Sequence, residues 1–382
     1  MSRPLAGPQG LLRSLNGRAI LEALARDGAQ TRAELMVSTG LSRTAVTQVL
    51  RMLEHAGAVA ADGVDHDTRG PAAARVGLHP RLGFAAAVHI DHRAAHVVLV
   101  DASGTVRAEQ HAEFAAEDDR VDHIVELVDQ CRNLAQVAEG AVQFVVVAAP
   151  GIVTADGGVR DDFGPDGGRF RAALAAALDC PVRIENDVNL AALAELTSGV
   201  GRDLSSFALL MLDEGLGAGI VIDGKLHRGF SGVAGEVMYL PQTPIPIGAP
   251  LVGDTVVGDL ALGVGRDSHA SLGEHLEAAS NGEESAQEIV AEIGRRIVLV
   301  AGTMGLILDP EAFILSGKAA HPALMDAIET VAAGYAEQLP LRFYASVFGP
   351  EAPLVGATGE AVAGLRDALF TRLLTPATKS GR

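Results

Sequence analysis

Hydrophobic and polar residues follow a helical period near the start of the chain. A first apolar stretch over Asn16–Arg26 predicts a helix, and the clearest pattern lies between Ser42 and His55. The apolar positions there are Val46, Val49, Leu50 and Leu53. The polar positions are Thr44, Thr47, Gln48 and Arg51. Both sets recur at i, i+3, i+4 and i+7, so the pattern predicts one helix with a packing face and a hydrogen-bonding face.

The residues before this helix predict a second, shorter one. Thr31 and Glu34 have the spacing of a capping box, which predicts a helix over Arg32–Thr39 that ends at Gly40. Ser42 can then cap the longer helix by accepting from its free backbone N–H groups. A short helix, a glycine-containing turn and a longer helix are typical of the helix-turn-helix.

Residues 58–78 change to a pattern of two short strands around a loop, which predicts a wing. Arg69 in that loop can reach a minor groove or a phosphate, although three aspartates stand beside it. The residues expected to face DNA are Ser42, Arg43, Thr44, Thr47, Gln48, Arg51 and Arg69. The alternative is a three-helix protein-interaction module without a DNA role. The polar stripe contains no Asp or Glu, which favours DNA.

The rest of the chain repeats one strand–turn–strand pattern. Apolar strands are expected over Phe84–Ile90 and Ala95–Asp101, and again over Phe207–Leu212 and Gly217–Ile222. The other elements expected are Asp122–Ala138, Val142–Ala149 closed by Pro150-Gly151, Ala172–Leu178, Leu190–Thr197 and Ser285–Leu308. The repeat predicts two similar α/β lobes facing a cleft, the plan of the actin-like and sugar-kinase ATPases with their ribonuclease H-like fold.

The predicted division follows from these patterns. Residues 1–80 form a winged helix-turn-helix, residues 81–189 together with 363–382 form a first α/β lobe, and residues 190–362 form the second. The helix over Ser285–Leu308 is a candidate for core packing or for a subunit contact, with core packing favoured.

Composition and charge restrict the class of protein further. The chain has 382 residues and a net charge of −18, yet residues 1–58 hold seven arginines and four acidic residues, so they carry +3 and the remainder −21. A basic head on an acidic body is consistent with a DNA reader, although acidic surfaces are ordinary. No apolar run is long enough for a membrane span and no signal-peptide pattern occurs, so we expect a cytoplasmic protein without a membrane partner. Two cysteines predict neither a disulfide framework nor a structural zinc site.

Four segments together resemble one family. They are residues 185–189 (ENDVN), residues 215–221 (GLGAGIV), residues 226–229 (LHRG) leading to residues 234–236 (AGE), and residues 69–71 (RGP) at the end of the wing. The chain resembles transcriptional regulators of the ROK family (repressor, open reading frame, kinase), which includes xylose-type and N-acetylglucosamine-type repressors and sugar kinases. The resemblance covers nearly the whole chain.

The resemblance implies a sugar-binding pocket. In family members that phosphorylate sugars, the residue matching Asp187 is the general base, and those matching Asn186, Glu236 and Gly151 help to hold the sugar. All four residue types are present here. Asn186 and Asp187 also suit a second interpretation, as the cap of the following helix, and both roles can coexist.

The nucleotide-binding pattern of the family kinases is lost at three places. Residues 89–93 read HIDHR where the kinases carry Asp-x-Gly-Gly-Thr, residues 213–215 read DEG where they carry Gly-Thr-Gly, and the third glycine-rich turn is reduced to residues 316–318 (SGK). Two like charges about 4 Å apart cost about 4 kcal/mol near a protein surface, so carboxylates here oppose a polyphosphate. We therefore expect no enzyme activity and no cofactor.

The zinc motif of the family is also missing. Residues 241–248 contain no cysteine, and Tyr239 occupies the position of the family's metal-binding His. The histidines His89, His92 and His96 are expected to be strand and loop residues and not a metal site. No metal is predicted, and the sugar inference is weakened because one sugar contact goes with the motif.

These observations predict a DNA-binding transcriptional regulator of the repressor type, whose partners are an operator in double-stranded DNA and a sugar or polyol effector. A symmetric homodimer or homotetramer is expected for a reader of palindromic sites. Two alternatives remain open: a regulator whose body only assembles or contacts another protein, and a sugar kinase with an accessory DNA-binding head.

Overall fold

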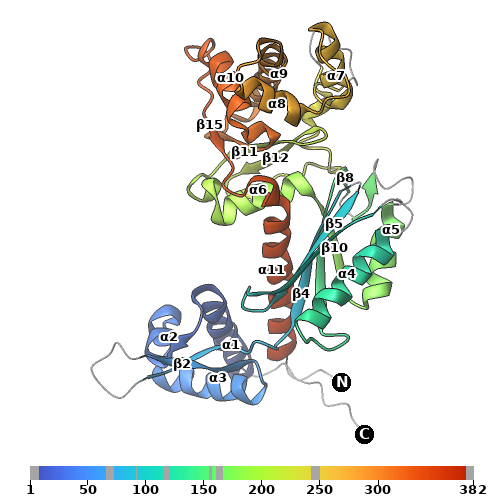
Figure 1. Cartoon of the computed structure of the whole chain (residues 1–382). Helices are drawn as coiled ribbons and strands as arrows, with labels where there is room; N and C mark the ends of the chain where they lie inside the picture. Colours follow the sequence, from blue (N-terminus) through green and yellow to red (C-terminus); the bar gives the residue numbers. More distant parts are fainter. Residues whose placement is uncertain are drawn as a thin grey trace.

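A computed structural model describes residues 8–65, 73–91, 93–114, 120–154, 157–160, 167–241 and 250–375. The chain forms a small N-terminal head and two larger α/β lobes, with the first lobe between the head and the second lobe (Figure 1). Within the described residues no helix combines the length and the apolar content needed to span a bilayer.

The head has the predicted three helices and two wing strands. Its elements are α1 (Pro8–Asp27), β1 (Gln30–Thr31), α2 (Arg32–Thr39), α3 (Arg43–His55), β2 (Val59–Asp65) and β3 (Ala73–Leu78). The capping box of Thr31 and Glu34 is formed, Gly40 ends α2 with φ 69°, and Ser42 caps α3. The pattern missed β1, which is two residues long and pairs with the distant strand β3.

The first lobe is built on a five-stranded sheet with the order β10-β7-β4-β5-β6. Its elements are β4 (Phe84–Ile90), β5 (Ala94–Asp101), β6 (Val106–Glu113), α4 (Arg120–Leu134), β7 (Val142–Ala149), the hairpin β8 (Ile152–Val153) and β9 (Val159–Arg160), α5 (Gly167–Leu178) and β10 (Val182–Asn186). Helix α4 ends four residues before the predicted Ala138, because Gln136 takes a left-handed φ of 54° that a helix cannot continue through.

The second lobe carries the order β13-β12-β11-β14-β15. Its elements are β11 (Phe207–Leu212), β12 (Leu216–Ile222), β13 (Lys225–Leu226), α7 (Asp254–Gly263), α8 (Leu272–Ser280), α9 (Glu284–Leu308), β14 (Ala312–Gly317), α10 (Pro322–Ala333) and β15 (Phe343–Ala345). The helices α6 (Asp187–Ser198) and α11 (Ala352–Leu374) complete the body. Apolar residues of α7 to α10 pack against one face of this sheet. The stripe on α9 is buried at Ile289, Ile293, Ile297 and Val300, which confirms the core interpretation.

The two sheets share one topology. In each, a central strand pairs antiparallel with the next strand along the chain and parallel with a later one, as β4 does with β5 and β7 and β11 does with β12 and β14. The predicted repeat is therefore present, and two similar lobes follow from it.

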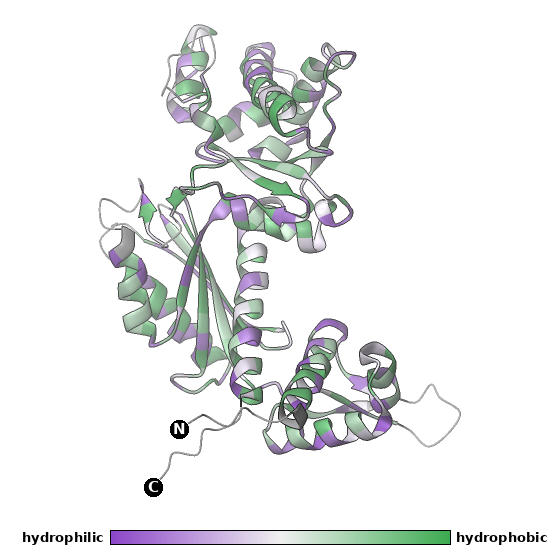
Figure 2. Cartoon of the chain, turned by 180° about the vertical axis from the view of Figure 1, so that it is seen from behind, coloured by the Kyte–Doolittle hydropathy of each residue, from purple (hydrophilic) through white to green (hydrophobic). Residues whose placement is uncertain are grey.

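Two helices join the lobes. Helix α6 packs apolar residues against the second sheet, and its Leu190 belongs to the core of the first lobe. Helix α11 runs along the first sheet down to the head (Figure 1), with hydrophobic and hydrophilic positions alternating along it (Figure 2). The boundary predicted at residue 363 falls within α11, which begins at Ala352, and the boundary at 189/190 falls within α6.

The head is packed onto the body. One hydrophobic cluster contains Ile20 and Leu53 of the head together with Leu365, Leu369 and Phe370 of α11. Gly17 of α1 lies so close to Leu374 that an added Cβ would meet its Cδ2 at 2.5 Å. The head therefore shares a core with the first lobe.

Candidate nucleic-acid interface and ligand cleft

The third helix of the head presents the predicted polar face. Val46, Val49, Leu50 and Leu53 are buried beneath it. The exposed side chains on the other side are Ser42, Arg43, Thr44, Gln48 and Arg51. These include guanidinium and amide groups, which hydrogen-bond base edges and phosphates.

Two of the predicted DNA-facing hydroxyls already take part in local hydrogen bonds. Ser42 Oγ accepts from the backbone N–H of Ala45 at 3.3 Å as the helix cap, and half-buried Thr47 donates to the carbonyl of Arg43 at 2.8 Å. Each hydroxyl can form a further hydrogen bond to DNA, but one of its donor or acceptor positions is already used. Arg69 lies outside the described residues, between β2 and β3 of the wing.

A cavity of about 500 Å³ lies where the two lobes meet. All four residues predicted to hold a ligand line it: Gly151, Asn186, Asp187 and Glu236. They come from the turn after β7, the start of α6 and the segment after β13, so distant parts of the sequence meet here. His89 and Asp91, from the segment that replaces the kinases' first nucleotide-binding loop, also line it, as does Met238, which sequence reasoning did not assign to a site.

Asn186 is the cap of α6 and also lines the cavity. Its Oδ1 accepts from the backbone N–H of Asn189 at 2.9 Å, which makes it the cap of α6, and its Nδ2 donates to the carbonyl of Gly151 at 3.1 Å. Gly151 has φ 87°, a conformation that favours glycine. The cap therefore joins the turn after β7 to the start of α6, and both residues line the cavity.

The side of the cavity formed by the β11–β12 turn is acidic. Asp213 and Glu214 both line it. Burial raises the pKa of the Asp213 carboxyl, Glu214 acts in the same direction, and Lys318 opposes both. Lys318 donates from Nζ to the backbone carbonyl of Asp213 at 2.9 Å, so this lysine is already engaged beside the turn.

The turn after β4 uses its own backbone donors. Asp91 Oδ1 accepts from the backbone N–H of Arg93 at 2.6 Å and of Ala94 at 2.7 Å. A phosphate-binding turn needs such N–H groups free to point at the ligand. Here the Asp91 carboxylate accepts from these N–H groups in place of a ligand phosphate.

The glycines of residues 215–221 have a packing explanation. A Cβ on Gly217 would lie 2.7 Å from Val188 Cγ2, and one on Gly219 would lie 2.7 Å from the carbonyl oxygen of Val188 and 2.5 Å from the Cβ of Ala192. Glycine lets β12 approach α6 at this distance. Part of the family pattern is thus required by the lobe junction and not by a bound ligand.

Comparison with known proteins agrees with this geometry. The model of the ROK family matches residues 85–245, and the model of a winged helix-turn-helix DNA-binding domain matches residues 13–59. The segment that matches the ROK family is thus preceded by one that matches a winged helix-turn-helix.

Relatives of this chain include named repressors. It is 21% identical over 239 residues to the xylose repressor of Bacillus subtilis, covering 61% of this chain and 62% of the repressor. It is 23% identical over 354 residues to the DNA-binding transcriptional dual regulator NagC of Escherichia coli, covering 85% of this chain and 86% of that one. The chain thus spans less than two thirds of the xylose repressor that it matches.

A solved structure shares the whole architecture. It is a ROK family transcriptional regulator, a homolog of the E. coli MLC protein, with a TM-score of 0.74 and 20% identity over 95% of this chain and 99% of that chain. At this identity the likeness shows the fold: a winged head followed by two lobes of the ROK type.

Proposed function

We propose that this chain is a DNA-binding transcriptional regulator of the ROK family and of the repressor type. The observation that carries the proposal is the exposed face of α3, where Arg43, Thr44, Gln48 and Arg51 stand on a winged helix-turn-helix with its apolar face buried. Relatives over most of the chain carry the name of DNA-binding regulator. Paired heads of a homodimer or homotetramer would sit about one helical turn, ~34 Å, apart on an operator.

The cavity between the lobes is proposed to bind a sugar or polyol without phosphorylating it. The Asn186 amide and the carboxylates of Asp187 and Glu236 are suitable partners for hydroxyl groups. Asp91, Asp213 and Glu214 supply acceptors where a nucleotide would need donors. These features favour ligand sensing over phosphoryl transfer.

Helix α11 offers a route from this cavity to the head. It packs against α6, whose cap lines the cavity, and its other end contacts α1 of the head. Arg366 of α11 donates to the carbonyl of Ala25 in α1 at 3.1 Å and to that of Ala102 in the β5–β6 turn at 2.8 Å. A ligand that prefers one lobe arrangement would therefore bias the position of the head.

The DNA-reading face is tested with two single variants. We expect Arg51→Ala and Gln48→Ala each to weaken operator binding by about 1–3 kcal/mol, because each removes hydrogen bonds to base edges or phosphates. The measurement is a gel-shift titration on an operator found by mapping bound genomic sites. Arg202→Ala, which removes an exposed arginine of the second lobe, is the charge-matched control and should leave binding unchanged. Wild-type affinity in both α3 variants would contradict the proposal.

Ligand sensing is tested by calorimetry against a panel of sugars and polyols. We expect binding heat from at least one of them in the wild type and its loss in Asp187→Ala, because the carboxylate accepts from ligand hydroxyls. A coupled ATP-consumption assay on the same panel checks the kinase alternative. Turnover of about 1–100 per second would establish a kinase instead. No heat with any of the compounds would favour a body that serves only assembly.

A further inference from the structure

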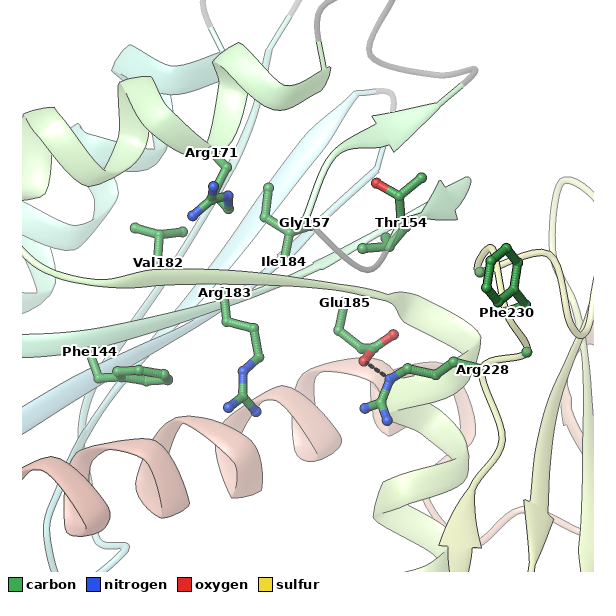
Figure 3. A pocket seen from close by; sticks show the side chains of 13 residues that line it. Phe144, Thr154, Gly157, Arg171, Val182, Arg183, Ile184, Glu185, Arg228 and Phe230 are labelled. Carbon is green, nitrogen blue, oxygen red and sulfur yellow. Dashed lines mark hydrogen bonds and ion pairs between the residues drawn. The ribbon is translucent and has the colours of Figure 1, made fainter.

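A second and larger cavity lies along strand β10, at the edge of the first sheet. Its volume is about 710 Å³, and it shares no lining residue with the cleft described above. First-lobe residues of β7, β8, α5 and β10 form one part of the wall, and residues 228–232 of the second lobe form another (Figure 3). Its occupant would contact both lobes.

Three arginines line this cavity, Arg171, Arg183 and Arg228, and the last two are each anchored by one carboxylate. Arg228 donates from Nε to Glu185 Oε2 at 2.6 Å, and Arg183 donates from Nη1 to Glu360 Oε2 at 2.5 Å. Figure 3 shows the Arg183, Glu185 and Arg228 side chains on the same side of β10, with the two guanidinium groups on either side of Glu185. Both arginine side chains are 48% exposed.

The anchoring leaves donors for a ligand. In the part of the chain that the structure describes, the two Nη atoms of Arg228 and the Nη2 atom of Arg183 have no hydrogen-bond partner. A guanidinium held on one edge keeps its remaining N–H groups in a fixed fork, the geometry that matches phosphate oxygens. Because Glu185 and Glu360 already restrict the two arginine side chains, less side-chain conformational entropy would be lost when a ligand binds.

The surroundings suit a small organic molecule more than a bare ion. The Arg183 guanidinium carbon lies 5.7 Å from the centre of the Phe144 ring, and Phe230 at the other end of the cavity is fully exposed. Glu360 and Glu185 balance the charges of Arg183 and Arg228, and Arg171 is a third arginine in the lining, so directional hydrogen bonds and apolar contact add to the attraction of this guanidinium. We propose that this cavity binds a small organic phosphate, whose phosphoryl oxygens accept from Arg183 and Arg228.

This site is connected to the cleft through Glu185. While Glu185 Oε2 accepts from Arg228, its Oε1 accepts from Asn189 Nδ2 at 3.0 Å and from the backbone N–H of Asn186 at 3.1 Å. Asn186 lines the cleft. A phosphate bound to the Nη atoms of Arg228 alters the Arg228–Glu185 ion pair and so changes the support of Asn186. This coupling, unlike the phosphate site itself, rests on the proposed function of the cleft.

The site is tested by calorimetry on the full chain at low salt with three probes: inorganic phosphate, glycerol 3-phosphate and glucose 6-phosphate. We expect saturable binding of at least one organic phosphate, weakened about tenfold in Arg183→Gln and Arg228→Gln, because each variant loses one charge-assisted hydrogen bond. Arg202→Gln, the exposed control arginine, should leave binding unchanged. Asp187→Ala should also leave it unchanged, which separates this site from the cleft.

A further variant is expected to raise the affinity for the organic phosphate. Glu185→Gln keeps a side-chain oxygen that can accept from Arg228 Nε but removes the negative charge that repels the phosphate, so it should tighten binding, a result that simple loss of structure does not produce. The proposal is overturned by the absence of saturable binding of either organic phosphate, by equal binding in wild type, Arg183→Gln and Arg228→Gln, or by inorganic phosphate binding as tightly as both organic probes.

Discussion

At the scale of single residues, Asn186 shows how one side chain serves the fold and the candidate site together. Its amide caps α6 and donates to the carbonyl of Gly151 while lining the cleft. The cap follows from local sequence, because an Asn before a helix satisfies a free backbone N–H. Its place in one cavity wall with Glu236 follows only from the meeting of two lobes.

The two cysteines give a prediction at the same scale. Burial raises the pKa of both the Cys131 and the Cys180 thiols to about 11, and Cys131 is fully buried. The thiolate is the reactive form, so a rise of about two units leaves about a hundredfold fewer thiolates than in an ordinary cysteine. At pH 8 we expect both thiols to react with a disulfide reagent only after the chain is unfolded in denaturant. Rapid labelling of the native protein would contradict their burial.

At the scale of elements, the contact between α6 and α11 depends on a missing side chain. A Cβ on Gly356 would lie 1.9 Å from the carbonyl oxygen of Leu190, so the two helices touch backbone to backbone. Sequence reasoning did not identify this contact, because a glycine inside a helical segment gives no sign of which helix it faces.

A second glycine of α11, Gly359, provides a control for the contact at Gly356. Gly359 lies about one turn further along and is exposed, and a Cβ added there would meet no described atom within 4 Å. We expect Gly356→Ala to destabilise the protein by about 1–3 kcal/mol through overpacking, and Gly359→Ala to stabilise it by about 0.5–1 kcal/mol through helix propensity. Denaturant unfolding followed by circular dichroism measures both. Equal changes in the free energy of unfolding for the two variants would mean that α6 and α11 accommodate the added methyl group without strain.

At the scale of the whole molecule, the head is held on the body by specific contacts as well as by a shared core. Arg366 donates to three backbone carbonyls, those of Ala25, Ala102 and Ser103. Burial lowers the pKa of its guanidinium, and the arginine is half-buried where α1, α11 and the β5–β6 turn meet. It therefore joins head and first lobe at one point.

We predict that Arg366→Ala loosens the head. Removing a half-buried donor leaves three carbonyls without this partner, and about 2 kcal/mol of stability should be lost. Limited proteolysis near residues 79–83 should become faster. Arg18→Ala removes an exposed ion pair to Asp367 on the same interface and should cost less than about 1 kcal/mol. Similar protease resistance in Arg366→Ala and the wild type would show that apolar packing alone holds the head.

The sequence by itself determined the elements whose signals are local. The strands Phe84–Ile90, Val142–Ala149 and Phe207–Leu212 and the helix Arg32–Thr39 have the predicted bounds. Alternation, helical period and capping act between residues a few positions apart, so they can be read along the chain. The same holds for the polar face of α3.

Tertiary structure decided what depends on partners far along the chain. The short strands β1 and β15 exist because a strand distant in the sequence pairs with each of them, and each is too short to show a hydrophobic pattern of its own. The cavity along β10 likewise arises where Arg183 of one lobe and Arg228 of the other come to the same side of a strand. Long-range packing sets these positions, and no local pattern records it.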